Sequence, residues 1–165
     1  MVQWGQQVTG QSLVVAILRP FDVQQIGAFI AGPVQGAGGV IIPPATYWPE
    51  IQRICDQYGV LVVSDEVICG FGRTGAWFGC ETFGFRPDLM TFAKGVTSGY
   101  VPLGGVMVGD RMARVLIDEG GEFNHGYTYS GHPVACAVAV ANIRLIQPLG
   151  LVPVSYTHPR AHETA

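Results

Sequence analysis

The stretch TYWPEIQRICDQYGVLVVSDE, at residues 46–66, predicts a helix that passes directly into a buried strand. Apolar side chains recur at helical spacing, at Ile51, Ile54, Cys55 and Tyr58. Thr46 is the expected N-cap, Pro49 suits the first turn, and Gly59 suits the position just past the helix end. The apolar run at residues 60–63 then reads as a strand that leads into an acidic pair.

Similar patterns extend on both sides of this stretch. Strands are expected at residues 27–34, 89–93 and 104–109, and the first of these reads as buried. A short helix capped by Asp110 and a long helix over residues 130–147 are expected further on. Continuous apolar strands that alternate with helices indicate an α/β fold, with a sheet covered by helices on both faces.

The composition excludes several classes of protein. The 165 residues are 48% hydrophobic and 13% charged, which is too apolar for a disordered chain. Nine basic residues against twelve acidic ones argue against a nucleic-acid partner. No apolar run approaches the ~20 residues that cross a bilayer, and the first residues do not read as a secretory signal. Free cytosolic thiols are expected for the four cysteines, and pairing in a secreted protein is the alternative.

Lys94 is the one lysine of the chain, and it follows the strand expected at residues 89–93. Asp65 follows the strand before it. Ligands of open α/β sheets bind at the carboxyl ends of strands, so neighbouring strands would bring both side chains to one crevice. A lysine that bonds an aldehyde and an acid that pairs with a pyridine nitrogen are the requirements of pyridoxal phosphate chemistry. The alternative is that Asp65 caps a loop and Lys94 is a surface charge.

Two other patterns need separate readings. Asp65 and Glu66 are adjacent, and neighbours on a strand point to opposite faces, which favours one functional and one structural acid. Residues 70–75 (GFGRTG) match the glycine pattern of dinucleotide-binding turns. Glycine and proline interrupt the segment that follows, so no helix is expected there, and residues 69–87 read as a long ordered loop.

The segment HGYTYSGH, at residues 125–132, is rich in hydroxyl groups just before the long helix. Hydroxyls and N–H groups at a helix start suit a phosphate, and plain N-capping by Ser130 is the alternative. His125 and His132 are too few for a zinc site and are expected to form hydrogen bonds within the loop. No metal site is predicted.

Taken together, these motifs resemble class III aminotransferases, which are pyridoxal phosphate enzymes of fold type I. The likeness is strongest to the transaminases that act on omega-amino acids or amines with pyruvate. The order and spacing of four segments carry it, from about residue 13 to 148. They are GPVQGAGGVIIPP (32–44), SDEVICGFGRTG (64–75), PDLMTFAKGVTSGYVPLGGVMVG (87–109) and HGYTYSGHPVACAVAVANI (125–143).

The resemblance implies a role for each matching residue. Lys94 bonds the cofactor aldehyde and then carries the proton between the substrate carbon and the cofactor. Asp65 pairs with the pyridine nitrogen, and Val67 packs on the ring. Thr128, with Tyr127 beside it, contacts the cofactor phosphate of the neighbouring subunit of a homodimer. The fold implied is the large domain of these enzymes, with a mostly parallel sheet between helices.

The reaction implied is transfer of an amino group from an amine or amino-acid donor to a keto acid such as pyruvate, in the cytoplasm. Two alternatives stay open. One is another class III enzyme, such as an aminomutase, racemase or decarboxylating relative. The other is a truncated chain without catalytic activity.

Three departures from the family pattern matter. Gly32 stands where the family usually has glutamate, which bears on how two different substrates are recognised. Residues 1–150 are expected to form only part of the large domain, so the isolated chain should have little turnover and should aggregate. Residues 151–165 are expected to be a non-native tail, because they resemble the translation of a sequencing adaptor. The resemblance also places Arg73 in the GFGRTG loop that shapes the site, and no chemical step is assigned to it.

Overall fold

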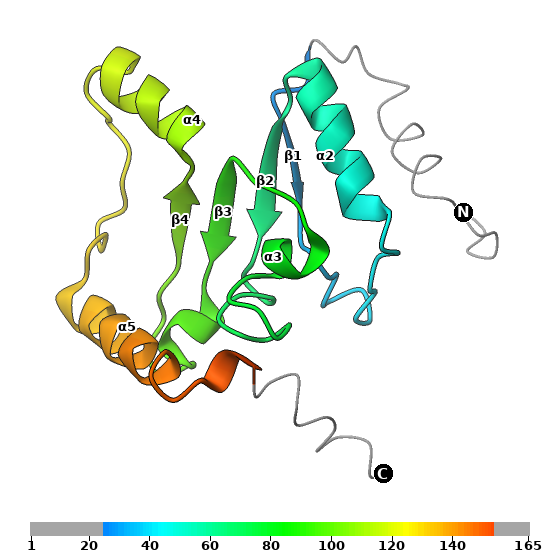
Figure 1. Cartoon of the computed structure of the whole chain (residues 1–165). Helices are drawn as coiled ribbons and strands as arrows, with labels where there is room; N and C mark the ends of the chain where they lie inside the picture. Colours follow the sequence, from blue (N-terminus) through cyan, green and yellow to red (C-terminus); the bar gives the residue numbers. More distant parts are fainter. Residues whose placement is uncertain (1–24, 154–165) are drawn as a thin grey trace.

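A four-stranded sheet forms the centre of the computed structural model, which describes residues 25–153. Strands β1 (Ala28–Ala31), β2 (Leu61–Asp65), β3 (Leu89–Phe92) and β4 (Gly105–Val108) lie side by side in that order. The first three are parallel, and β4 is antiparallel to β3. Figure 1 shows the carboxyl ends of β1, β2 and β3 at the same edge of the sheet. The expectation of a mostly parallel α/β sheet is confirmed.

Helix α2 (Tyr47–Tyr58) connects β1 to β2 and carries the main core. Trp48 is 1% exposed, and its ring stacks on Phe85 with the centroids 4.0 Å apart. Its indole nitrogen donates to the carbonyl oxygen of Pro33 at 3.2 Å. The other buried members of this core are Ile51, Ile54, Cys55, Val60, Val62 and Cys80. This cluster fixes α2 against β2 and so positions the carboxyl end of that strand.

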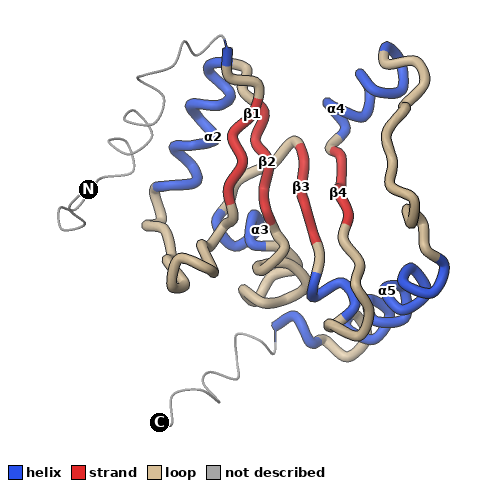
Figure 2. Tube along the Cα trace, turned by 180° about the vertical axis from the view of Figure 1, so that it is seen from behind, coloured by secondary structure: helices blue, strands red, loops and turns tan. Residues whose placement is uncertain are grey.

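Helices flank the sheet as predicted (Figure 1), but within residues 25–153 the strands are more exposed than their apolar sequence indicates. Strand β1 was expected to be buried, yet Ile30 is 67% exposed. On β4, Val106 is 55% exposed. Figure 2 shows that α5 (Pro133–Ile146) lies beyond the end of the strands and does not lie over the sheet. The apolar strand sequence predicted burial, but the described helices do not supply it.

Two helix starts differ in detail from the sequence reading. Thr46 occupies the N-cap of α2, but its side chain makes no capping hydrogen bond. Helix α4 (Asp110–Arg114) has Gly109 at its N-cap, so Asp110 is its first residue. The helical path then continues through η3 (Val115–Glu119). By contrast, the end of α2 is as predicted, because Gly59 adopts the left-handed conformation with φ of 69°.

The long helix also begins later than the pattern suggested. It is α5, and its N-cap is His132, whose Nδ1 accepts from the backbone N–H of Ala135 at 3.4 Å. The alternative of N-capping by Ser130 is wrong, because its hydroxyl accepts from the backbone N–H of Tyr127 at 2.9 Å. The expectation that His132 forms a local hydrogen bond is confirmed.

The segment at residues 69–87 contains one short helix that was not predicted, α3 (Gly79–Phe83). Residues 70–75 form turns, and no helix begins at Gly75, as expected. Residues 1–24 lie outside the described residues, as do residues 154–165 of the proposed tail. Within residues 25–153, no helix is long and apolar enough to cross a membrane.

We expect the protein to lose stability at alkaline pH because of its buried thiols. Burial raises the pKa of Cys80 to about 12 and that of Cys55 to about 11. Unfolded thiols ionise near pH 9, so the unfolded chain releases protons that the folded chain retains. The free energy of unfolding should therefore be maximal below pH 9 and fall as the pH rises towards 11. Urea midpoints at pH 8, 9 and 10 test this, and a Cys80→Ala variant should flatten the slope.

Candidate active site

Asp65 and Lys94 come together at the carboxyl edge of the sheet. Asp65 ends β2, and Lys94 follows β3, the neighbouring parallel strand. Both side chains line a cavity of about 420 Å³. The other lining residues are Gly32, Val34, Gln35, Gly36, Ala37, Gly38, Val67 and Ile68. The predicted crevice between two strand ends therefore exists, and Val67 lines it as well.

The Asp65 carboxylate is held in place through one of its two oxygens. The Thr91 hydroxyl donates to Oδ1 at 3.0 Å, from the residue paired with Asp65 across the sheet. The backbone N–H of Val67 donates to the same oxygen at 3.2 Å. Within the described part of the chain, no hydrogen bond reaches Oδ2. The two hydrogen bonds to Oδ1 thus orient the carboxylate, and Oδ2 is available to accept a hydrogen bond from a ligand.

Lys94 begins the 3₁₀ turn η2 (Lys94–Thr97) in an unusual backbone conformation. Its φ is 46°, in the left-handed region that costs a residue with a side chain about 1–3 kcal/mol. Such outliers cluster at functional sites, where the surrounding structure enforces them. Behind the turn, a Cβ added to Gly95 would lie 3.1 Å from the Cβ of Phe71. The turn is therefore packed tightly against the loop of residues 70–75.

Glu66 has the structural role that the alternation of side chains predicted for one of the two acids. It is fully buried at 0% exposure, whereas Asp65 is exposed. Its carboxylate accepts from the backbone N–H groups of Gly79 at 2.8 Å and Cys80 at 2.7 Å. The Ser64 hydroxyl donates to it at 3.1 Å. Through these hydrogen bonds, Glu66 connects the start of α3 to the end of β2.

A second, more apolar cavity of about 540 Å³ adjoins the first. Lys94 lines both, as do Val34, Gly36 and Ile68. Arg73 and Thr74 from the GFGRTG loop line the second cavity. The placement agrees with the expectation that the GFGRTG loop, which carries Arg73, shapes the site. Lys94 thus lines two cavities, one that contains Asp65 and one whose walls are more apolar.

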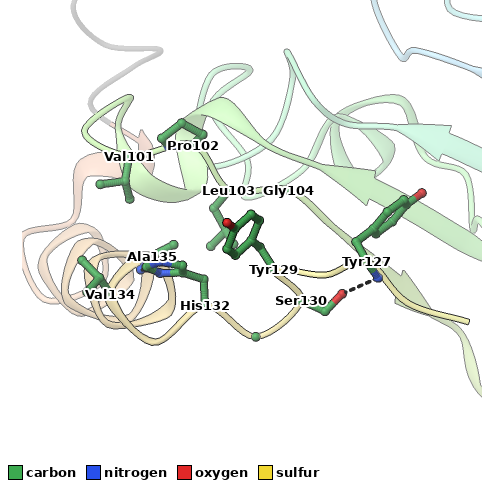
Figure 3. Close-up of a pocket in the computed structure, with 11 residues that line it drawn as sticks. Val101, Pro102, Leu103, Gly104, Tyr127, Tyr129, Ser130, His132, Val134 and Ala135 are labelled. Atoms are coloured by element: carbon green, nitrogen blue, oxygen red, sulfur yellow. Dashed lines mark hydrogen bonds between the residues drawn. The ribbon is translucent and has the colours of Figure 1, made fainter.

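Tyr127 and Thr128 do not join this site within the chain. Tyr127 lines a separate pocket, shown in Figure 3, together with Tyr129, Ser130 and His132 and the segment at residues 101–104. This pocket shares no lining residue with the cavity of Asp65 and Lys94. Thr128 belongs to the same loop but is not among the residues that line the pocket. The phosphate role of these two residues therefore stays a prediction.

Sequence reasoning missed one residue near Lys94. Asn142, on α5, makes three hydrogen bonds to the turn that follows the lysine. Nothing in its local sequence signals this contact, because its partners lie more than forty positions earlier in the chain.

Among residues 25–153, no group of three side chains could hold a metal ion.

The fold and the site define an α/β protein with an acid and a lysine at adjacent strand ends. The family model of the class III aminotransferases matches residues 8–155, so the chain belongs to this family. The putrescine–pyruvate aminotransferase of Pseudomonas aeruginosa is 61% identical over 124 residues, which are 75% of this chain and 27% of that protein. The chain spans about a quarter of the length of the curated relatives it matches.

Solved structures agree in fold. A transaminase from the marine bacterium Virgibacillus superposes with a TM-score of 0.81 at 56% identity, over 87% of this chain and 32% of that one. An amine transaminase from an uncultivated Pseudomonas species, solved in its pyridoxal phosphate-bound form, has a TM-score of 0.78 at 44% identity, with the same coverage of 87% and 32%. The expected fold type I architecture is confirmed.

Proposed function

We propose that this chain is the cofactor-binding part of a pyridoxal phosphate-dependent transaminase. One observation carries the proposal: in a class III family member, Asp65 and the single lysine line one cavity at neighbouring strand ends. The residues present fit the cofactor, because they offer an amine for an aldehyde and a carboxylate with an available oxygen for a ring N–H. A related amine transaminase binds pyridoxal phosphate, which supports the assignment.

When bound, pyridoxal phosphate supplies an aldehyde that takes up amines and a ring that withdraws electrons from the substrate carbon. Lys94 Nζ would be the amine that holds the aldehyde, and as a free amine it would carry a proton to and from the substrate carbon. The Asp65 carboxylate would hold the proton on the pyridine nitrogen through a charge-assisted hydrogen bond. Val67, two residues further on, would pack against the ring.

We further propose that Tyr127 and Thr128 serve the site of a second copy in a homodimer. Their loop is separate from the cavity of Asp65 and Lys94, and Tyr127 is 78% exposed. Backbone N–H groups and hydroxyls in this loop suit a phosphate. A second subunit would then complete each site. In this proposal, residues 1–150 form part of the large domain, and residues 151–165 are a tail outside that domain.

The substrate class is an amine or omega-amino acid as donor and a keto acid as acceptor, in the cytoplasm. The relative from Pseudomonas aeruginosa is named for putrescine and pyruvate, which supports this class. Gly32 lines the cavity beside Asp65, so the usual glutamate is absent from the wall of the site. An aminomutase is the second candidate, and product analysis with and without added pyruvate separates the two.

Mapping of a reduced adduct tests the proposal. The chain is mixed with pyridoxal phosphate, reduced with borohydride and digested, and the modified peptide is identified by mass. We expect the adduct on Lys94, in excess over the N-terminal amine. Asp65→Asn should slow its formation about 10–100-fold, because a charge-assisted hydrogen bond is worth about 1.5–3 kcal/mol. Asp56→Asn, an exposed carboxylate on α2, is the matched control and should leave the rate unchanged. Modification of the N-terminus alone would contradict the proposal.

A further inference from the structure

The turn that carries Lys94 is held from outside by one side chain of α5. Asn142 Nδ2 donates to the carbonyl oxygens of Gly95 at 2.9 Å and Val96 at 3.0 Å. Its Oδ1 accepts from the Ser98 hydroxyl at 2.7 Å. Both donor hydrogens and the acceptor oxygen of the amide are therefore used on the turn that follows the lysine.

The turn needs such support because its own geometry is poor. Both of its ends have left-handed backbones, with φ of 46° at Lys94 and 50° at Ser98. Its internal backbone hydrogen bonds are long: 3.3 Å from Gly99 N to the Lys94 oxygen, and 3.2 Å from Ser98 N to the Gly95 oxygen. The usual N–O distance is ~2.9–3.0 Å, so the bonds to Asn142 are the better-formed ones.

We propose that Asn142 is a positioning residue that fixes the Lys94 amine in the cavity it shares with Asp65. By holding the carbonyl groups of the two residues after Lys94, it sets the direction in which the lysine side chain leaves the turn. A displacement of a reacting group by about 1 Å can lower a reaction rate about 10²-fold. This role rests on the proposed function of Lys94, and it makes α5 part of the site without contact between Asn142 and any ligand.

A purely structural role for Asn142, in which it only docks α5, would have different consequences. In that case, loss of Asn142 would change the stability of the chain but would leave the relative placement of the Lys94 amine and the Asp65 carboxylate unchanged. The single lysine allows the two roles to be separated, because only one other amine exists in the chain. The N-terminal amine is an internal reference in every sample.

The experiment compares two aldehydes, each followed by reduction and peptide mass mapping. Formaldehyde with cyanoborohydride requires only that the amine be accessible. Pyridoxal phosphate with borohydride also requires the amine to be placed correctly in the cavity. For each reagent, the labelling of Lys94 is divided by that of the N-terminus. The variants are Asn142→Ala, Asn142→Asp and Ser98→Ala, with Gln147→Ala as an amide control at the end of the same helix.

We expect Asn142→Ala and Asn142→Asp to lower the pyridoxal phosphate ratio about tenfold or more and to leave the formaldehyde ratio within about twofold. Asn142→Asp retains the acceptor for Ser98 but replaces the two donated hydrogen bonds with repulsion between a carboxylate oxygen and two carbonyl groups, so its effect should be at least as large as that of Asn142→Ala. Ser98→Ala should have a smaller effect, and Gln147→Ala none. A pyridoxal phosphate ratio unchanged in both Asn142 variants, or a parallel fall of both ratios, would overturn the proposal.

Amide hydrogen exchange keeps the test independent of the cofactor. If the unmodified chain shows no preference of pyridoxal phosphate for Lys94, the proposed function fails, and exchange decides whether Asn142 still fixes the turn. We expect Asn142→Asp to accelerate exchange at Ser98 and Gly99 about tenfold while β2 amides stay protected. Equal exchange at these two amides in both proteins would refute the positioning role.

Discussion

Replacing Lys94 with alanine is expected to abolish covalent attachment of pyridoxal phosphate anywhere but at the N-terminus. No other lysine exists among the 165 residues, so no second side chain can supply the amine. Amino transfer by any form of the protein that is active with Lys94 should fall more than about 10²-fold, because the nucleophile and the proton carrier are lost together. Visible absorbance and the mass of the borohydride-reduced peptide measure the first effect, and keto-acid consumption measures the second.

Lys94→Arg is the matched control for charge. It keeps a cation at the end of β3, but a guanidinium does not bond an aldehyde in this way. If the lysine acts as a nucleophile, arginine should be as defective as alanine. Arginine that restores adduct formation or turnover would show that position 94 contributes only charge. A full-strength adduct in Lys94→Ala would remove the basis of the proposed function.

The alternation of side chains along β2 explains why the two acids could be separated from sequence. Asp65 and Glu66 are adjacent at the end of an extended segment, so they had to face opposite ways, and the structure has one exposed and one buried. The meeting of Asp65 with Lys94 followed from parallel strands whose carboxyl ends share an edge. Both inferences depended on local pattern and on the geometry of a sheet.

Contacts between distant segments could not be predicted in the same way. Asn142 lies in an Ala-rich helix whose pattern says only that it packs closely, and its partners are set by where α5 docks. The exposure of β1 depends likewise on which elements cover the sheet, and strand sequence alone does not contain that information.

Replacing Glu66 with alanine should produce a large loss of stability. The carboxylate is fully buried and accepts from two backbone N–H groups and one hydroxyl. Its removal leaves the N–H groups of Gly79 and Cys80 without partners in the interior, and each such group costs about 1–3 kcal/mol. We expect the free energy of unfolding to fall by about 3–4 kcal/mol, measured as a shift of the urea midpoint followed by tryptophan fluorescence.

Glu81→Ala provides the comparison that isolates burial. Glu81 is an exposed residue of α3 that accepts a single hydrogen bond from the Phe78 N–H at 3.2 Å, so its loss should cost less than about 1 kcal/mol. If the urea midpoint of Glu66→Ala lies as close to that of the unmodified protein as the midpoint of Glu81→Ala does, then water or a neighbouring group satisfies the N–H groups of Gly79 and Cys80. The larger loss would mean that Glu66 holds α3 against β2. It would then also hold the adjoining loop, whose Arg73 and Thr74 form a wall of the second cavity beside Lys94.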